Sequence, residues 1–572
     1  MKKLLSLLSF LALTIVMHSQ SINWVKNMEG LRNCEGNSIA LDAAGNVYTT
    51  GYFDSIMDFD PGSSTYTIAS LGRRDVFVSK LDGSGHFIWA KTFGNLWGDE
   101  TGNAIKIDGS GNVITTGIFY GEVDFDPGVG TYTLNSNYGD MFVSKLDNNG
   151  NFIWAKNMGG SDFVEGRSLS IDPSNNVLLT GRFKGTIDFD PGTNTYPITS
   201  FNGNGHPDLF MAKLDASGNF LWAHGYGIFG WHESMFITND ASGNTYMTGT
   251  YAGSVDFDAG AGSSILSSPS HNNTYFLKLD IGGNFMWVKE LGDSTHHSYG
   301  YSMVLDNAGN IYSTGSFSGT KDFDPGAGTF TMTAPNPVGE DSYVMKLDAS
   351  GNFVWARQMS GTMAKGFGIN LDNYGNVVTT GVYDGTSDID SGPGVYNLSI
   401  APGSPGMYFM KTHPITGGVL SAKIYGAGGW CHGTSIVTDG QNNIYTTGFF
   451  GSTGAMVDFD PGPATFTLNT TDRNTNFILK LSDNVITAHD ELNDKVSPIS
   501  ISPNPNNGHF NISTKEKINL NLIDNLGQIV QIIELHEGNN FQKNIQVLSS
   551  GLYFISGQSD KGSINQKIIV TQ

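Results

Sequence analysis

Residues 45–51 have the sequence Gly45-Asn46-Val47-Tyr48-Thr49-Thr50-Gly51, a Gly-Asn turn signal followed by a short β-rich run. Similar segments return six more times, at a spacing of about 66 residues. They lie at 111–117, 175–181, 243–249, 309–315, 375–381 and 442–448. Self-similarity at a fixed period is the signature of a repeat architecture. The chain is therefore predicted to build most of its core from seven copies of one unit.

Two further motifs recur in the same order in each copy. Lys80-Leu81-Asp82 returns from Lys145, Lys213, Lys278 and Lys346, from Lys480 with Ser482 in place of the Asp, and as Lys411-Thr412. Asp58-Phe59-Asp60-Pro61-Gly62 returns in variants that begin at Asp124, Asp188, Asp256, Asp322, Asp388 and Asp458. In the first copy the expected strands are 38–41, 47–53, 76–81 and 87–91, with a hairpin between the second and third. Four short antiparallel strands per unit are typical of a β-propeller blade.

The two ends of the array predict how it closes. The fourth strand carries a tryptophan in the first five copies, for example Trp89 and Trp154, but the seventh copy stops near Leu481 without a fourth strand. The segment Ile22–Lys26 resembles Phe152–Lys156. We therefore expect an all-β, seven-bladed propeller over 21–484, closed by an N-terminal outer strand that leaves no exposed sheet edge.

Composition and charge narrow the function classes. The formal net charge is −22, which opposes binding to nucleic acid and to anionic lipid surfaces. Solubility and cation binding both remain explanations of this charge. Residues 1–20 have the pattern of a signal peptide, with Lys2 and Lys3 before an apolar run, and no other stretch approaches a transmembrane segment. The mature chain is therefore expected to be exported.

The repeat pattern resembles the SBBP-type bacterial β-propeller repeat over residues 21–484. The matching elements are Asp-x-x-Gly-Asn-x-Tyr-x-Thr-Gly, then Lys-Leu-Asp-x-x-Gly, then an aromatic outer strand. The Asp-Phe-Asp-Pro-Gly insertion departs from the simplest form of this pattern. The resemblance implies the propeller fold and export, and it implies no particular activity.

The C-terminal segment is predicted to be a separate small β-sandwich over 498–572, joined through a linker at 485–497. Its markers are Ser502-Pro503-Asn504-Pro505 with Gly508, Asp524 with Gly527, Gly551–Phe554 and Lys567–Val570. They resemble the type A C-terminal sorting domain of the type IX secretion system. The resemblance implies the type IX machinery as a partner, removal of the domain, and release from the cell or attachment to its outer surface.

The candidate binding surface is the face where the longer and more variable loops emerge. One column lies seven residues before the Asp that ends each first strand, and it is expected to ring the mouth of the central channel. It consists of Glu35, Thr101, Glu165, Glu233, Tyr299, Lys365 and His432. The same loops hold Trp97, Phe163, Trp231 and Trp430, which are suited to stacking on sugar rings. The alternative is that these residues only pack and solvate the loops.

Two other features each leave two interpretations open. Cys34 and Cys431 occupy the same position in the first and seventh copies, so they are either a disulfide across the closure or two free buried thiols. The Asp-Phe-Asp-Pro-Gly carboxylates are either part of a calcium site or, as we favour, elements of a tight turn. No other cofactor is indicated.

No linear catalytic motif stands out, because there is no zincin pattern, nucleophile elbow or phosphate-binding loop. The leading hypothesis is an exported binding or interaction module with a glycan or protein ligand. The alternative is a secreted carbohydrate-active enzyme, a lyase or hydrolase, that uses Glu35, Glu165 or Glu233. A scaffold for surface adhesion without a pocket is a third interpretation.

Overall fold

The computed structural model describes most of the chain. The described residues are 17–201, 205–227, 232–291, 296–335, 339–389, 396–401, 403–426, 428–451, 456–461, 465–469, 473–486, 499–502, 508–515, 517–524, 529–546, 551–559 and 562–570. Of the predicted signal peptide, residues 1–16 lie outside this range. Of the predicted linker, 487–497 lie outside it, whereas Val485 and Ile486 belong to a strand. The chain divides into two compact units, His18–Asn484 and a second unit of Met1–Met17 with Val485–Gln572.

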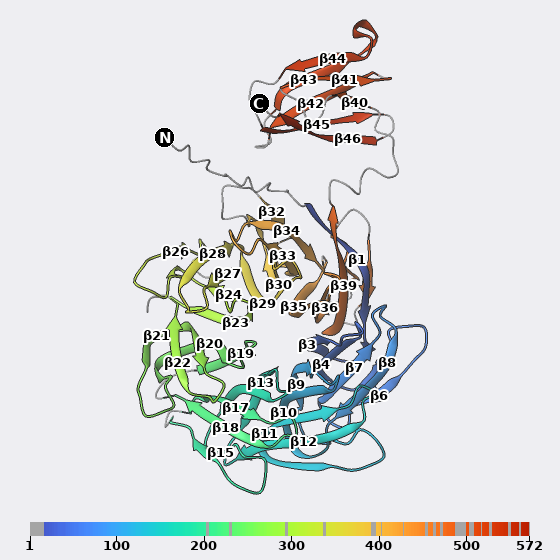
Figure 1. Ribbon diagram of the computed structural model, residues 1–572. Coiled ribbons are helices and arrows are strands. Elements are labelled where there is room, and N and C mark those ends of the chain that lie inside the picture. The colour runs from blue at the N-terminus through green and yellow to red at the C-terminus, as the bar shows by residue number, and fades with distance from the viewer. Residues whose placement is uncertain are drawn as a thin grey trace. The chain divides into compact units, whose positions relative to one another are not determined.

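The larger unit consists of antiparallel sheets arranged around a ring (Figure 1). The first sheet contains β3 (Cys34–Leu41), β4 (Val47–Phe53), β7 (Asp75–Leu81) and β8 (Phe87–Phe93). The second repeat supplies β9 (Thr101–Ile107), β10 (Val113–Asp124), β11 (Thr133–Leu146) and β12 (Phe152–Gly160). The third supplies β13 (Val164–Ile171), β14 (Val177–Phe183), β17 (Asp208–Leu214) and β18 (Phe220–Tyr226). The fourth supplies β19 (His232–Asn239), β20 (Thr245–Asp256), β21 (Ile265–Leu279) and β22 (Phe285–Glu290). Two more supply β23 (Ser298–Leu305), β24 (Ile311–Phe317), β27 (Asp341–Leu347) and β28 (Phe353–Met359), then β29 (Met363–Leu371), β30 (Val377–Asp384), β33 (Gly406–Thr412) and β34 (Val419–Tyr425).

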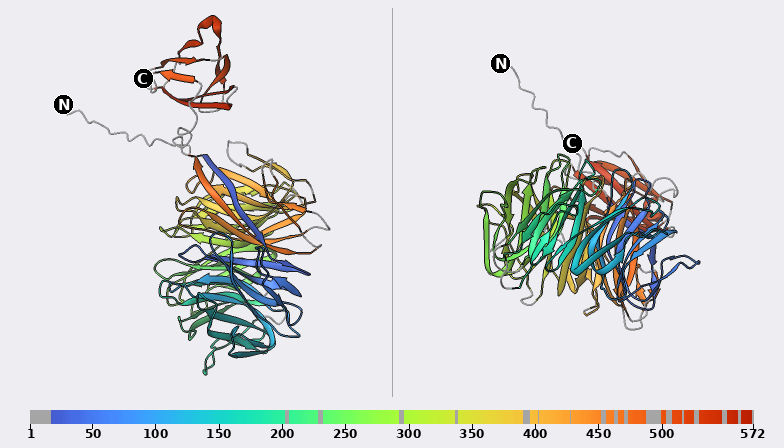
Figure 2. Two further views of the ribbon diagram at one scale, coloured as in Figure 1. Left: turned by 90° about the vertical axis from the view of Figure 1, so that its right-hand side faces the viewer. Right: turned by 90° about the horizontal axis from the view of Figure 1, so that it is seen from below.

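The last sheet of the ring combines the two ends of the unit. Its order is β1 (Met17–Asn27), β39 (Thr475–Ile486), β36 (Ile444–Gly451) and β35 (Trp430–Thr438). The N-terminal strand β1 therefore lies beside β39, in the outer position that the sequence predicted for it. The views in Figure 2 show these two strands side by side.

The turn after each first strand explains why the motif Asp-x-x-Gly-Asn-x-Tyr repeats. In the first copy, Asp42 Oδ1 accepts hydrogen bonds from the backbone N–H groups of Ala44 at 3.0 Å and Asn46 at 2.9 Å. Gly45 adopts φ of 80°, a conformation that costs glycine little. Tyr48 then donates its hydroxyl to Asp42 Oδ2 at 3.0 Å. The motif is thus a self-capped turn that starts the second strand.

The insertion between the second and third strands is a hairpin in every repeat. Separate hairpins are β5 (Ile56–Asp58) with β6 (Thr67–Ala69), β15 (Thr186–Asp188) with β16 (Pro197–Thr199), β25 (Thr320–Asp322) with β26 (Thr331–Thr333), β31 (Thr386–Asp388) with β32 (Asn397–Ser399), and β37 (Met456–Asp458) with β38 (Thr467–Asn469). In the second and fourth repeats the hairpin continues β10 into β11 and β20 into β21. Two hairpins also pair with the preceding chain, β5 with β2 (Glu29–Gly30) and β15 with β12.

The Asp-Phe-Asp-Pro-Gly segment anchors this hairpin. Phe59 is fully buried and packs against Phe53 and Phe77. Asp58 Oδ1 accepts from the backbone N–H groups of Asp60 and Tyr66, at 3.0 and 2.8 Å. These contacts are the turn chemistry favoured from the sequence. In the described part of the chain, no group of three or more His, Cys, Asp or Glu side chains is placed to hold a metal ion.

Hydrophobic clusters lie between neighbouring sheets. The same packing joins the last sheet to the first, because Tyr445 and Ile478 share a buried cluster with Ile39 and Val47. The core of the larger unit is therefore continuous across the junction of its two ends.

The smaller unit has two antiparallel sheets. One contains β40 (Ile499–Ser502), β41 (His509–Thr514) and β44 (Gln542–Gln546), and the other β43 (Ile529–Leu535), β42 (Ile518–Asp524), β45 (Gly551–Ser559) and β46 (Gly562–Val570). A short 3-10 helix, η2 (Glu537–Asn539), precedes β44. Both sheets contribute to one buried cluster that includes Ile512, Leu522 and Ile555. No helix in the described residues is long and apolar enough to cross a membrane.

Candidate functional site

The first strand of each repeat lies at the centre of the ring: β3, β9, β13, β19, β23, β29 and β35 (Figure 1). The predicted column occupies one register position on all of them. Glu35 lies opposite Tyr52, for example, and His432 lies opposite Phe449. Six of the seven side chains are half-buried, and the side chain of Glu233 lies outside the described residues.

A second column lies two residues further along each strand, at a β-bulge that recurs in all seven copies. Its members are Asn37, Asn103, Arg167, Met235, Tyr301, Phe367 and Thr434, and all are half-buried. A bulge leaves one residue unpaired and changes the direction of its side chain. We call the two columns together the channel mouth.

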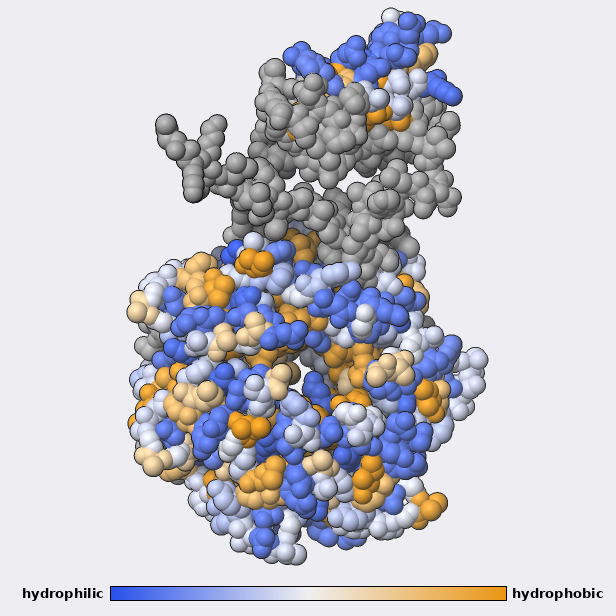
Figure 3. All heavy atoms as spheres, viewed as in Figure 1, coloured by the Kyte–Doolittle hydropathy of each residue, from blue (hydrophilic) through white to orange (hydrophobic). Residues whose placement is uncertain are grey.

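The sequence interpretation missed this second column. In the sequence, this column could be recognised as the position that follows a nearly constant glycine, such as Gly36, and whose residue differs from copy to copy. A Cβ atom on Gly36 would lie 2.0 Å from Nδ2 of Asn476 in the adjoining sheet. Glu35 accepts a hydrogen bond from Asn474 of the last repeat, and Asn37 donates to the carbonyl oxygen of Gly102 in the next sheet at 3.0 Å, so both columns link neighbouring sheets at the centre of the ring. In the space-filling view the surface is hollowed at this centre (Figure 3).

One side of the channel mouth is aromatic. Six half-buried rings follow one another across three sheets, and we call them the aromatic belt: His297, Tyr299, Tyr301, Phe367, His432 and Phe449. Successive ring centroids are separated by 6.1, 6.1, 5.2, 6.3 and 4.9 Å. The structure therefore joins the predicted residues Tyr299 and His432 through Tyr301 and Phe367, which had not been predicted.

The His432 imidazole of this belt is neutral at ordinary pH. Burial, assisted by the nearby charge of Lys365, lowers the pKa of His432 to about 4. Lys365 itself pairs with Glu340, with 3.1 Å between Nζ and Oε2. His432 can therefore act as a flat, uncharged ring beside Phe449.

The other side of the channel mouth is polar. Asn103 Nδ2 donates to Glu165 Oε1 at 3.1 Å and to the carbonyl oxygen of Gly166 at 2.8 Å, which links two sheets. Glu165 also pairs with Arg167 at 3.1 Å and Arg182 at 2.9 Å, one on each carboxylate oxygen. Both of its oxygens are thus engaged within the protein.

The predicted tryptophans do not form one group. Trp430 lies beside the aromatic belt, with its centroid 6.1 Å from His432 and 5.9 Å from Phe449. Trp97 is 89% exposed and makes no contact with the belt among the described residues. Trp231 lies outside the described residues.

The proposed disulfide is absent, and of the two alternatives the structure has the free thiols. Cys34 and Cys431 are both buried, each in the hydrophobic cluster of its own sheet, with Phe53 and Phe450 respectively. Each cysteine directly precedes a channel-mouth residue, so alternation turns its side chain into the sheet core. Burial raises the pKa of both thiols well above the usual range.

Comparison with known families agrees with this architecture. Residues 287–319 match the SBBP β-propeller repeat, and residues 500–571 match the secretion system C-terminal sorting domain. The class is thus a β-propeller repeat protein with a sorting tail. More narrowly, the chain carries an SBBP repeat and a type IX sorting domain, which implies secretion or attachment to the cell surface.

Individual relatives are distant. An uncharacterized WD repeat-containing protein of Acanthamoeba polyphaga mimivirus is 23% identical over 474 residues, which cover 69% of this chain and 33% of that protein. The match thus spans about a third of the relative's length. Solved structures that are similar include the quinohemoprotein alcohol dehydrogenase of Comamonas testosteroni, with 12% identity, 80% and 76% of the two chains covered and a TM-score of 0.35. A europium-containing methanol dehydrogenase has 10% identity, 80% and 93% coverage and a TM-score of 0.37. Such low similarity carries no information about activity.

Proposed function

We propose that the larger unit is a closed, seven-bladed propeller that acts as an exported or surface-attached binding module, with a glycan as its ligand at the channel mouth. The observation that carries this proposal is the aromatic belt. Its rings are half-buried rather than sealed in a core, and they continue from one sheet to the next. Flat rings of this kind cover the apolar faces of sugars, while neighbouring polar groups bind hydroxyls.

The polar side of the channel mouth supports binding rather than cleavage. A catalytic carboxyl group needs an oxygen directed at the bond that breaks. Both oxygens of Glu165 are engaged by Arg167, Arg182 and Asn103, and Glu35 accepts a hydrogen bond from Asn474. These contacts hold the two carboxylates as fixed parts of a recognition surface.

A polysaccharide panel tests the proposal when the purified full chain is assayed for both binding and release of reducing ends. We expect binding without cleavage. Replacing Tyr301→Ala together with Phe367→Ala should weaken binding at least tenfold, or about 1.4 kcal/mol. Tyr374→Ala is the matched control, because Tyr374 is 62% exposed on a turn outside the belt. Cleavage by the wild type that disappears in Glu35→Gln or Glu165→Gln would instead identify an enzyme. Unchanged binding by the Tyr301→Ala, Phe367→Ala double variant would show that the aromatic belt is not the glycan-binding site.

A further inference from the structure

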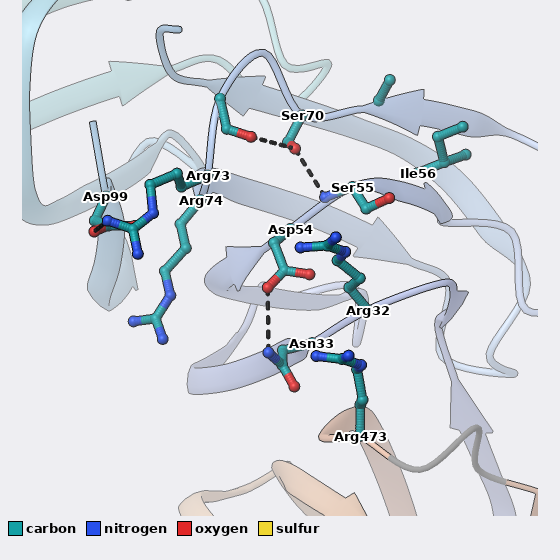
Figure 4. A pocket seen from close by; sticks show the side chains of 12 residues that line it. Arg32, Asn33, Asp54, Ser55, Ile56, Ser70, Arg73, Arg74, Asp99 and Arg473 are labelled. Carbon is teal, nitrogen blue, oxygen red and sulfur yellow. Dashed lines mark hydrogen bonds and ion pairs between the residues drawn. The ribbon is translucent and has the colours of Figure 1, made fainter. Parts of the chain in front are cut away.

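An arginine-rich pocket lies where the first and last sheets of the ring meet (Figure 4). The chain has seven arginines in all, and four of them line this pocket: Arg32, Arg73, Arg74 and Arg473. Asp54 and Asp99 are its two acidic residues. In a chain with a net charge of −22, this pocket concentrates positive charge at one place.

The four arginines come from three loops, which belong to both ends of the ring. Arg32 lies between β2 and β3, Arg73 and Arg74 lie just before β7, and Arg473 lies just before β39. Close to these loops, the backbone N–H of Cys34 donates to the carbonyl oxygen of Asn474 at 2.8 Å. The pocket is therefore complete only when the last sheet closes against the first.

The arginines are not all neutralised within the protein. Arg73 pairs with Asp99, with 3.3 Å between their charged atoms. The half-buried Arg74 instead lies over the ring of Tyr52, with Cζ 4.2 Å from the centroid, and no carboxylate in the described residues pairs with it. Arg32 is exposed and likewise has no ion pair there. Figure 4 shows Arg32 and Arg473 beside Asp54 and Asn33 at the same opening.

The pocket adjoins the channel mouth through one pair of residues. Tyr52 lies opposite Glu35 on the neighbouring strand, and burial followed by the Glu35 carboxylate raises the pKa of the Tyr52 hydroxyl. Arg74, Tyr52 and Glu35 thus make a continuous path from the pocket to the centre of the ring. A ligand held at the channel mouth has a cationic pocket next to it.

We infer that this pocket binds the carboxylate or sulfate groups of an acidic polysaccharide, an inference that rests on the proposed function and gives its ligand class. Guanidinium groups present a rigid pair of donors that matches both oxyanions. The stacking of Arg74 on Tyr52 fixes its guanidinium before the ligand arrives, which reduces the ordering cost of binding. Since the pocket spans the ring closure, a bound polyanion also stabilises the closed state.

The test measures binding of polygalacturonate, dextran sulfate and neutral dextran to the purified full chain, at low and high salt. We expect one or both acidic polymers to bind at least tenfold more tightly than neutral dextran, with the preference reduced by salt. Arg74→Gln should weaken binding of the acidic polymer at least tenfold, and Arg74→Lys should bind it more tightly than Arg74→Gln but less tightly than wild type. Arg357→Gln makes the same charge change in β28, outside the pocket, and should alter affinity less than twofold. Polygalacturonate and dextran sulfate distinguish a carboxylate from a sulfate ligand.

The outcomes separate this inference from the proposed function. If neutral dextran binds as well as the acidic polymers, or Arg74→Gln behaves like Arg357→Gln, the pocket is not the anion site. If Tyr301→Ala with Phe367→Ala leaves binding intact while Arg74→Gln abolishes it, the channel-mouth proposal fails and the anion pocket stands. A melting temperature of Arg74→Gln within a degree or two of wild type shows that the loss is not one of folding.

Discussion

The indole Nε1 of Trp24 donates to the carbonyl oxygen of Gly83 at 3.4 Å, and this contact joins the last sheet of the ring to the first. Trp89 makes the same bond to Asn148 at 3.2 Å, and Trp355 makes it to Pro414 at 3.1 Å, each at a sequence separation of 59. Lys480 adds the companion bond to Gly83 at 2.8 Å. The first strand of the unit therefore occupies the position of a fourth strand in the last repeat.

Replacing Trp24→Ala should lower the free energy of unfolding by roughly 2–4 kcal/mol, because the change removes an indole packed edge-on against Tyr445 and its bond across the closure. Urea unfolding measures this loss. Trp97→Ala is the matched control and should stay within about 0.5 kcal/mol of wild type, since Trp97 is 89% exposed. Equal effects of the two substitutions would contradict the role given to Trp24.

Glu100 should make stability depend on pH in an unusual direction. Burial, and then the neighbouring Asp75 carboxyl, raises the pKa of Glu100 from 4.5 to about 8. The folded protein therefore holds this proton over a range in which the unfolded chain releases it. The contribution of Glu100 is fully present below pH 4.5 and is lost as the pH rises toward 8, at up to about 1.4 kcal/mol per pH unit.

Glu100→Gln tests this assignment, because it removes the ionisation and keeps the shape. We expect the melting temperature of the variant to exceed that of wild type at pH 8, and the difference to shrink at pH 5. Glu122→Gln is an exposed control on the neighbouring strand β10. Melting curves of Glu100→Gln that shift in parallel with wild type at both pH values would argue against the assignment.

The two cysteines should resist alkylation in the native protein. Cys34 and Cys431 are both 0% exposed, and burial disfavours their thiolate forms. Iodoacetamide at pH 8 should label neither residue until denaturant is added, and mass spectrometry should then find both thiols free. Recovery of a Cys34–Cys431 peptide pair from the native protein would overturn the assignment of free thiols.

Chelation should leave the larger unit intact. The carboxylates of the Asp-Phe-Asp-Pro-Gly turns already accept backbone N–H groups, as Asp58 does from Tyr66 at 2.8 Å. Their turn geometry therefore needs no cation. We expect the same melting temperature in excess EDTA and in millimolar calcium. A rise of several degrees with calcium would restore the calcium interpretation of these turns.

Sequence periodicity predicted much of the fold because the turns of each repeat are formed by residues that are close together in the sequence. Asp42, Gly45 and Tyr48 specify one turn through contacts within seven residues, so copies of this pattern can be recognised without knowledge of the fold. The outer position of β1 was also predictable, since Trp24 resembles the tryptophans of the other fourth strands. These signals are short-range or are repeated several times.

The candidate site could be predicted less completely from the sequence, because its residues come from different repeats. Tyr301 and Phe367 lie in different copies, and their contact depends on the angle between neighbouring sheets and on the bulge at each residue. The arginine pocket combines Arg32 with Arg473, which are brought together by ring closure. Of the two interpretations left open for the cysteines, the structure has the free thiols for a related reason, because equivalent positions on adjacent sheets need not face each other.

The closure itself is tested most directly by an engineered disulfide between β1 and β39. Ser482 Oγ donates to Asn23 Oδ1 at 2.6 Å, so these side chains face each other across the two strands. We expect Asn23→Cys with Ser482→Cys to oxidise to an intramolecular disulfide, identified by mass spectrometry of the linked peptides without reduction. The control Asn23→Cys with Asp280→Cys, placed at the corresponding position of another sheet, should remain reduced. A linked control pair, or no link between residues 23 and 482, would contradict the closed ring and the channel mouth that depends on it.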